Sequence, residues 1–92
     1  MKVFINPGHM PGVDPGAVNP TSGLKECDVA LAVGKLVEYY LKNAGCEVMR
    51  LQSDNLNGES PAYPNVCQTA NDWGADVFVS LHCNAFNGCL LY

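Results

Sequence analysis

Two short apolar stretches that each lead to a histidine constrain the fold of this chain most. Val77–Leu81 is rich in β-branched and aromatic residues and closes on His82, and Val3–Ile5 leads through a short turn sequence to His9. Apolar runs of this length that stop at polar or turn-forming residues are typical of buried strands. The sequence holds 2 histidines in total, so both are predicted to lie where a strand ends.

Helical patterns alternate with these strand patterns along the rest of the chain. The predicted elements, in order, are a strand over 2–6, a helix over 24–43, a strand over 47–51, a helix over 65–73 and a strand over 77–82. A loop rich in proline and glycine over 10–23 precedes the first helix. The β-α-β-α-β order predicts an α/β fold with a parallel sheet, mixed if further strands extend it, and helices packed on the sheet.

The first predicted helix has an apolar stripe and an acidic residue on the same face. The spacing of the stripe predicts that its members face the sheet: Val29, Val33, Leu36, Val37, Tyr40 and Leu41. Glu26 precedes Val29 by three positions, so helical geometry places its carboxylate on the core side. A carboxylate turned inward needs a partner, because an unpaired buried charge is costly.

The two histidines and this glutamate are predicted to meet. In a parallel α/β sheet, the carboxyl ends of strands and the amino ends of the following helices share one edge, where ligands bind. His9, Glu26 and His82 all fall on that edge, and two imidazoles with one carboxylate are a ligand set of catalytic zinc ions. The alternative is that the histidines cap backbone groups and pair with the carboxylate. Ser80 shares the strand face of His82 and is either its hydrogen-bond partner or simply a small residue in a tight sheet.

Composition narrows the class of protein further. A chain of 92 residues fits one domain, and its net charge of −4 argues against nucleic acid or an anionic membrane as partner. No apolar run approaches the ~18 residues of a membrane span, and the amino terminus lacks a signal-peptide core. The 5 cysteines include no CxxC pair, so we expect buried thiols in a reducing compartment, or a disulfide whose partners cannot be assigned.

Several separated blocks of the sequence resemble the amidase-3 family of zinc-dependent N-acetylmuramoyl-L-alanine amidases, the AmiC/CwlV type. In chain order the blocks are Ile5-Asn6-Pro7-Gly8-His9, Asp14-Pro15-Gly16-Ala17, Gly23 with Glu26, Ala70-Asn71 and Ala75 through Ala85. The resemblance implies one zinc ion per chain, bound by His9, Glu26 and His82. It also implies peptidoglycan as partner, cleaved between N-acetylmuramic acid and L-alanine of the stem peptide. The residues expected to support the ligands or contact substrate are Asn6, Asp14, Ser80 and Asn84.

The chain departs from the family pattern in two respects. Cys67 stands near the position where an arginine usually precedes the Ala-Asn pair. The family domain is longer, so residues 1–92 are expected to form a single amidase-3-like domain that is incomplete at its carboxyl end, with the tail 89–92 as a contracted next strand. The catalytic glutamate of the family would then lie beyond Tyr92, and the general acid or base is unassigned. The loop acids that could approach the edge are Asp14, Asp54 and Glu59.

These expectations leave alternatives open. Half of an α/β layer should leave one side of its sheet uncovered, and self-association is one way to cover it. Action at the bacterial cell wall is implied, with an unknown export route, either lysin-like release or a signal already removed. The chain could instead be a zinc-dependent wall-binding remnant without catalysis. A more remote alternative is a redox or thiol-regulated α/β protein that uses its cysteines.

Overall fold

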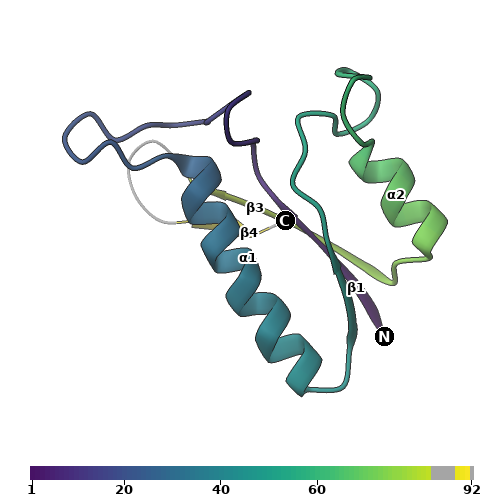
Figure 1. Ribbon diagram of the computed structural model, residues 1–92. Helices are drawn as coiled ribbons and strands as arrows, with labels where there is room; N and C mark the ends of the chain where they lie inside the picture. Colours follow the sequence, from purple (N-terminus) through teal and green to yellow (C-terminus); the bar gives the residue numbers. More distant parts are fainter. Residues whose placement is uncertain (84–88, 92) are drawn as a thin grey trace.

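A computed structural model of the chain describes residues 1–83 and 89–91 and has six regular elements (Figure 1). They are β1 (Lys2–Pro7), α1 (Glu26–Asn43), β2 (Glu47–Arg50), α2 (Val66–Trp73), β3 (Val77–Cys83) and β4 (Cys89–Leu91). The predicted order of strands and helices is confirmed. The first helix begins at Glu26, two residues later than predicted, because Lys25 is extended and forms a bridge with Val18.

The strands form one mixed sheet in the order β2-β1-β3-β4. The central strand β1 is parallel to both β2 and β3, whereas β4 is antiparallel to β3. Val3 of β1 lies beside Val77 of β3 and Pro7 lies beside Leu81, so the two strands end at the same edge. The N–H of Gly8 donates to the carbonyl of Leu81 at 2.7 Å, which holds the chain just before His9 against β3.

Each face of the sheet carries one helix. Because side chains alternate along a strand, Val3 and Ile5 pack with Ala30 of α1, whereas Phe4 packs with Val66 and Ala70 of α2. Figure 1 shows the two helices as separate layers. The expectation of an uncovered side is therefore wrong, because α2 folds back over Phe4. Its cover is partial, since Phe78, which stacks on Phe4, is 37% exposed.

The face that α1 presents to the sheet differs from the predicted stripe. Its buried line runs through Ala30 and Gly34 and is flanked by Val33, Val37 and Leu41. A Cβ atom at Gly34 would lie 3.0 Å from Cγ of Pro7, so the helix sits closely on the strands along its smallest residues. Leu36 and Tyr40 are 58% and 67% exposed, and their assignment to the core side was wrong.

The shorter helix follows its sequence signals closely. The side chain of Asn65 caps α2 by accepting a hydrogen bond from the N–H of Gln68 at 2.9 Å, and Gly74 ends the helix with a left-handed φ of 81°. Among the described residues, neither helix has the length and apolar content of a bilayer-crossing segment. Cys27, Cys46 and Cys67 are free thiols.

Candidate metal centre

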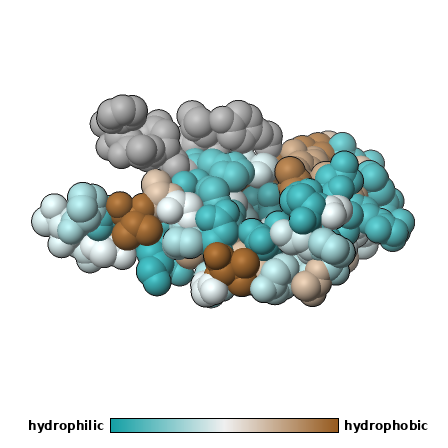
Figure 2. All heavy atoms as spheres, turned by 90° about the horizontal axis from the view of Figure 1, so that it is seen from above, coloured by the Kyte–Doolittle hydropathy of each residue, from teal (hydrophilic) through white to brown (hydrophobic). Residues whose placement is uncertain are grey.

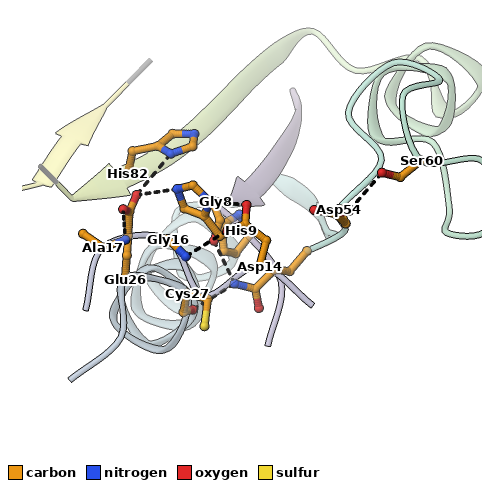
Figure 3. Close-up of polar contacts among 12 residues, drawn as sticks. Gly8, His9, Asp14, Gly16, Ala17, Glu26, Cys27, Asp54, Ser60 and His82 are labelled. Atoms are coloured by element: carbon orange, nitrogen blue, oxygen red, sulfur yellow. Dashed lines mark hydrogen bonds and ion pairs between the residues drawn. The ribbon is translucent and has the colours of Figure 1, made fainter. Parts of the chain in front are cut away.

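Three side chains from three different elements converge at the carboxyl edge of the sheet. His9 follows β1, Glu26 opens α1 and His82 lies near the end of β3, and one ligand atom from each lies within 4.8 Å of the other two (Figure 3). Nε2 of His9 is 3.0 Å from Oε2 of Glu26, and Nδ1 of His82 is 3.2 Å from the same oxygen. The structure thus brings together the three residues that the sequence placed on one edge.

Glu26 is fixed by the loop that precedes it. The first backbone N–H groups of a helix lack partners within the helix, and here those of Glu26 and Cys27 donate to the carbonyls of Ala17 and Pro15 at 2.8 and 3.0 Å. The N–H of Ala17 in turn donates to Oε1 of Glu26 at 3.1 Å. The side chain of Glu26 is only 6% exposed. One carboxylate oxygen is therefore held by the loop, and the other faces the two imidazoles.

His9 adopts an unusual backbone conformation and has a carboxylate partner. Its φ is 62°, in the left-handed region that non-glycine residues visit rarely and that often marks functional positions. Nδ1 donates to Oδ2 of Asp14 at 2.7 Å. Burial lowers the pKa of His9, but the hydrogen bond to Asp14 and the charge of Glu26 outweigh it, so the pKa lies above 6.5.

Asp14 is the loop acid that reaches this group. The hydrogen bond from His9 and a second one from the N–H of Gly16, at 3.1 Å to Oδ1, hold the pKa of Asp14 below 3.8. Asp54 instead accepts from Ser60 at 2.9 Å, and Figure 3 shows this pair apart from the histidines. Glu59 caps backbone N–H groups of its own loop, among them that of Asn57 at 2.9 Å.

His82 is supported from inside the sheet. Its Nε2 lies 3.1 Å from Oγ of Ser80, as strand alternation predicted, and that hydroxyl donates to Oδ1 of Asn6 at 3.1 Å. Asn6 is buried and belongs to β1, next to β3. Of the four residues expected to support the ligands or contact substrate, Asn6, Asp14 and Ser80 contact one of the two histidines directly or through one another. Asn84 lies outside the described residues.

Two glycines leave room for the rings. A Cβ atom at Gly8 would lie 2.6 Å from Nδ1 of His82, and one at Gly16 would lie 2.5 Å from Cδ2 of His9. Gly16 also has a φ of 70°, which favours glycine independently of the space available. Any side chain at either position would displace an imidazole.

Gln52 is a positioning residue that the sequence did not indicate. Its Nε2 donates to the carbonyl of Gly8 at 3.1 Å and to that of Cys27 at 2.8 Å. It thereby ties the end of β1 to the first turn of α1, the two segments that carry His9 and Glu26. A single glutamine after a strand has no distinctive spacing, and only its position directly after the second strand could have suggested it.

The donor set fits a zinc ion. Two imidazole nitrogens and one carboxylate oxygen are typical of catalytic zinc sites, and the outer atom of each ligand is held by a further group, which is the usual support of such ligands. Both imidazoles point at one carboxylate oxygen while their other nitrogens contact Asp14 and Ser80. A cation between the three ligand atoms would satisfy all of them at once.

The face of the molecule at the carboxyl edge of the sheet is largely polar. Seen from above the carboxyl edge, the surface is largely hydrophilic, with separate hydrophobic residues instead of one continuous apolar patch (Figure 2). A cavity of about 290 Å³ lies elsewhere, between α2 and the start of β3, lined by Cys67, Ala70, Asn71, Ala75, Asp76 and Phe78. Because it lies toward the opposite end of β3 from His82, it plays no part in this group.

The fold and this group define an α/β protein with a two-histidine, one-carboxylate donor set at the edge of its sheet. A family model described as N-acetylmuramoyl-L-alanine amidase matches residues 3–89, and the chain belongs to this family. The resemblance found in the sequence motifs is thus confirmed.

Curated relatives and solved structures agree with this assignment. The chain is 34% identical to the sporulation-specific N-acetylmuramoyl-L-alanine amidase of Bacillus subtilis, over 96% of this chain and 33% of that protein. It is 37% identical to N-acetylmuramoyl-L-alanine amidase AmiA of Escherichia coli, over 91% of this chain and 27% of that protein. The solved N-acetylmuramoyl-L-alanine amidase AmiC2 of Nostoc punctiforme superposes with a TM-score of 0.72 at 32% identity, over 91% of this chain and 44% of that one. The chain therefore spans about a third of the length of these curated relatives.

Proposed function

We propose that this chain holds one zinc ion and hydrolyses the amide bond between N-acetylmuramic acid and L-alanine of the peptidoglycan stem peptide. The ligands are Nε2 of His9, the carboxylate of Glu26 and Nδ1 of His82. The observation that carries the proposal is the convergence of these three atoms within 4.8 Å, in the part of the chain that the family model matches.

Each residue of the group has a distinct part in this proposal. Bound there, zinc polarises the amide carbonyl and makes water an effective nucleophile near neutral pH. Glu26 supplies the negative charge that attracts the cation, and Asp14 holds His9 in place. The largely hydrophilic face of the molecule seen in Figure 2 suits a hydrated glycopeptide. Hydrolysis leaves a carboxylate on the lactyl group and a free amine on L-alanine.

The positions of the loop acids favour one alternative, a zinc-dependent wall-binding module without catalysis. Asp14 is bonded to His9 and Gly16, and Asp54 and Glu59 bond within their own loop. Among the described loop residues, none of these acids is placed to act as a general base. A missing general base lowers an enzymatic rate by about 10²–10⁴.

Zinc-dependent release of stem peptides separates the two functions. The full 92-residue chain, loaded with zinc, is incubated with purified peptidoglycan, and new amino-terminal L-alanine is measured. Release that a chelator and His82→Ala abolish, and that Asp54→Asn leaves intact, supports the amidase. Zinc-dependent sedimentation with the wall without release supports the binding module. Stem-peptide release and wall sedimentation that are both the same with and without zinc would contradict both functions.

A further inference from the structure

The two histidines are held by different partners through different ring nitrogens. His9 directs Nδ1 to Asp14 and Nε2 to Glu26, whereas His82 directs Nε2 to Ser80 and Nδ1 to Glu26. The metal-facing atom therefore differs between the two rings. A carboxylate only accepts hydrogen bonds, so Asp14 requires a proton on Nδ1 of His9. A serine hydroxyl can donate or accept, so the contact with Ser80 does not by itself decide the tautomer of His82.

Asn6 decides the direction of that contact. Its Nδ2 donates to the carbonyl of Leu51 at 3.0 Å and lies 3.4 Å from the carbonyl of Pro7. Both are backbone oxygens that can only accept, so the amide nitrogen must face them and Oδ1 must face Ser80. The Ser80 hydroxyl has one proton, and it donates that proton to Oδ1 at 3.1 Å. Its oxygen is then an acceptor for Nε2–H of His82.

The opposite arrangement is costly. If Ser80 donated its proton to Nε2 of His82, then Oδ1 of Asn6 would lose the hydroxyl donor that faces it. Asn6 is only 4% exposed, and a buried acceptor without a donor is unfavourable because it has lost its hydrogen bonds to water. Once a cation lies between Nδ1 of His82 and the carboxylate of Glu26, which are 3.2 Å apart, the network therefore favours a proton on Nε2 and a lone pair on Nδ1.

We propose that the series Leu51 carbonyl, Asn6 amide and Ser80 hydroxyl forms a relay that selects Nδ1 of His82 as its metal-binding atom, whereas Asp14 selects Nε2 of His9. The inference rests on the proposed zinc site and adds positioning roles for Asn6 and Ser80. The series of hydrogen bonds begins at the backbone carbonyl of Leu51, just after β2, passes through Asn6 of β1 and ends at Ser80 and His82 of β3. The segment that directly follows the edge strand β2 thus takes part in orienting a metal ligand.

The test combines zinc affinity with nitrogen NMR of the imidazole rings. The chain has 2 histidines, so spectra of the zinc-loaded protein hold two ring spin systems that can be assigned directly. We expect zinc on Nδ1 and a proton on Nε2 for His82, with the opposite pattern for His9. Ser80→Ala should weaken zinc binding by about 10–100-fold, the usual loss when a ligand loses its supporting partner.

Two further variants separate positioning from stability. Ser80→Thr keeps the hydroxyl and should restore both zinc affinity and the Nε2–H signal. Ser53→Ala removes another internal hydroxyl, whose single proton is donated to the carbonyl of Pro64 at 2.6 Å and not to a group of the relay, and should leave zinc affinity unchanged. Zinc bound through Nε2 of His82, or equal losses in Ser80→Ala and Ser53→Ala, would overturn the relay while leaving the zinc site intact. A wild-type chain that binds no zinc would overturn the zinc site and the relay together.

Discussion

Replacing Asp14 by asparagine tests how His9 is held as a ligand. Oδ1 of Asp14 accepts from the N–H of Gly16 at 3.1 Å, and Oδ2 accepts from Nδ1 of His9 at 2.7 Å. Asparagine has one oxygen for these two donors. Because the backbone N–H of Gly16 can only donate, the asparagine oxygen faces Gly16. The new NH₂ group is then turned toward Nδ1 of His9, where it opposes the proton that keeps Nε2 available for zinc.

The expected loss of zinc affinity depends on how exposed the side chain of Asp14 is. Loss of a partner that supports a metal ligand weakens binding by about 10–100-fold. The side chain of Asp14 is 48% exposed, so water can replace part of the lost contact and screen the lost charge. We therefore expect the lower end of this range, about tenfold or about 1.4 kcal/mol.

Competition with a chromophoric zinc chelator measures the effect. Asp54→Asn is the matched control, because it removes a loop carboxylate that contacts Ser60 and not a histidine. Zinc affinity of Asp14→Asn within about twofold of the wild type would refute the reasoning, since the expected loss is about tenfold. An equal loss in the control would refute it as well.

Three other variants test the packing around the group. Gly16→Ala should lower zinc affinity and stability more than Gly12→Ala. Both glycines have a positive φ, but of the two only Gly16 would place a Cβ within 3 Å of the side chains of His9 and Glu26. Thermal unfolding and zinc titration compare the two variants. Glu38→Gln removes the ion pairs with Lys42 and Arg50 and should lower the free energy of unfolding, measured with urea, by about 0.5 kcal/mol. Hydrogen bonding to Lys42 and the charge of Arg50 lower the pKa of Glu38 below 4.5, so this difference should be present above that pH and disappear as the pH falls through the lower folded value; a difference that persists in strong acid would contradict it. Leu36→Ala should change the free energy of unfolding by less than about 0.5 kcal/mol, because Leu36 is exposed. A loss of about 2–5 kcal/mol, typical of a core leucine, would show that Leu36 faces the core as the hydrophobic spacing predicted.

Alternation and element order were sufficient to predict much of the spatial arrangement of the candidate site. Period-two spacing placed Ser80 on the face of His82, and the parallel arrangement brought the end of β1 beside the end of β3. The position of Glu26 in the first turn then brought it to the same edge. These features depend on local periodicity and on a general rule of α/β sheets, so a single sequence contains them.

Contacts that depend on close approach could not be predicted from periodicity. The face of α1 is decided by Gly34, which lets the helix lie against Pro7, and hydrophobic spacing instead selected Leu36 and Tyr40. Asp14 reaches His9 because the loop folds back between Met10 and Asp14, a geometry that no spacing rule contains. The two carbonyls joined by Gln52 come from different elements.

X-ray absorption at the zinc edge of the zinc-loaded chain tests the central claim most directly. The account predicts one zinc ion per chain with two imidazole nitrogens at about 2.0–2.1 Å and a carboxylate oxygen at about 2.0–2.2 Å. The 5 cysteines provide the competing ligands, and a thiolate would appear at about 2.3 Å. A spectrum with imidazole scattering and no sulfur, lost on replacement of His9 and His82, is the expected result. Sulfur in the coordination sphere, or zinc retained by the double variant, would contradict the account.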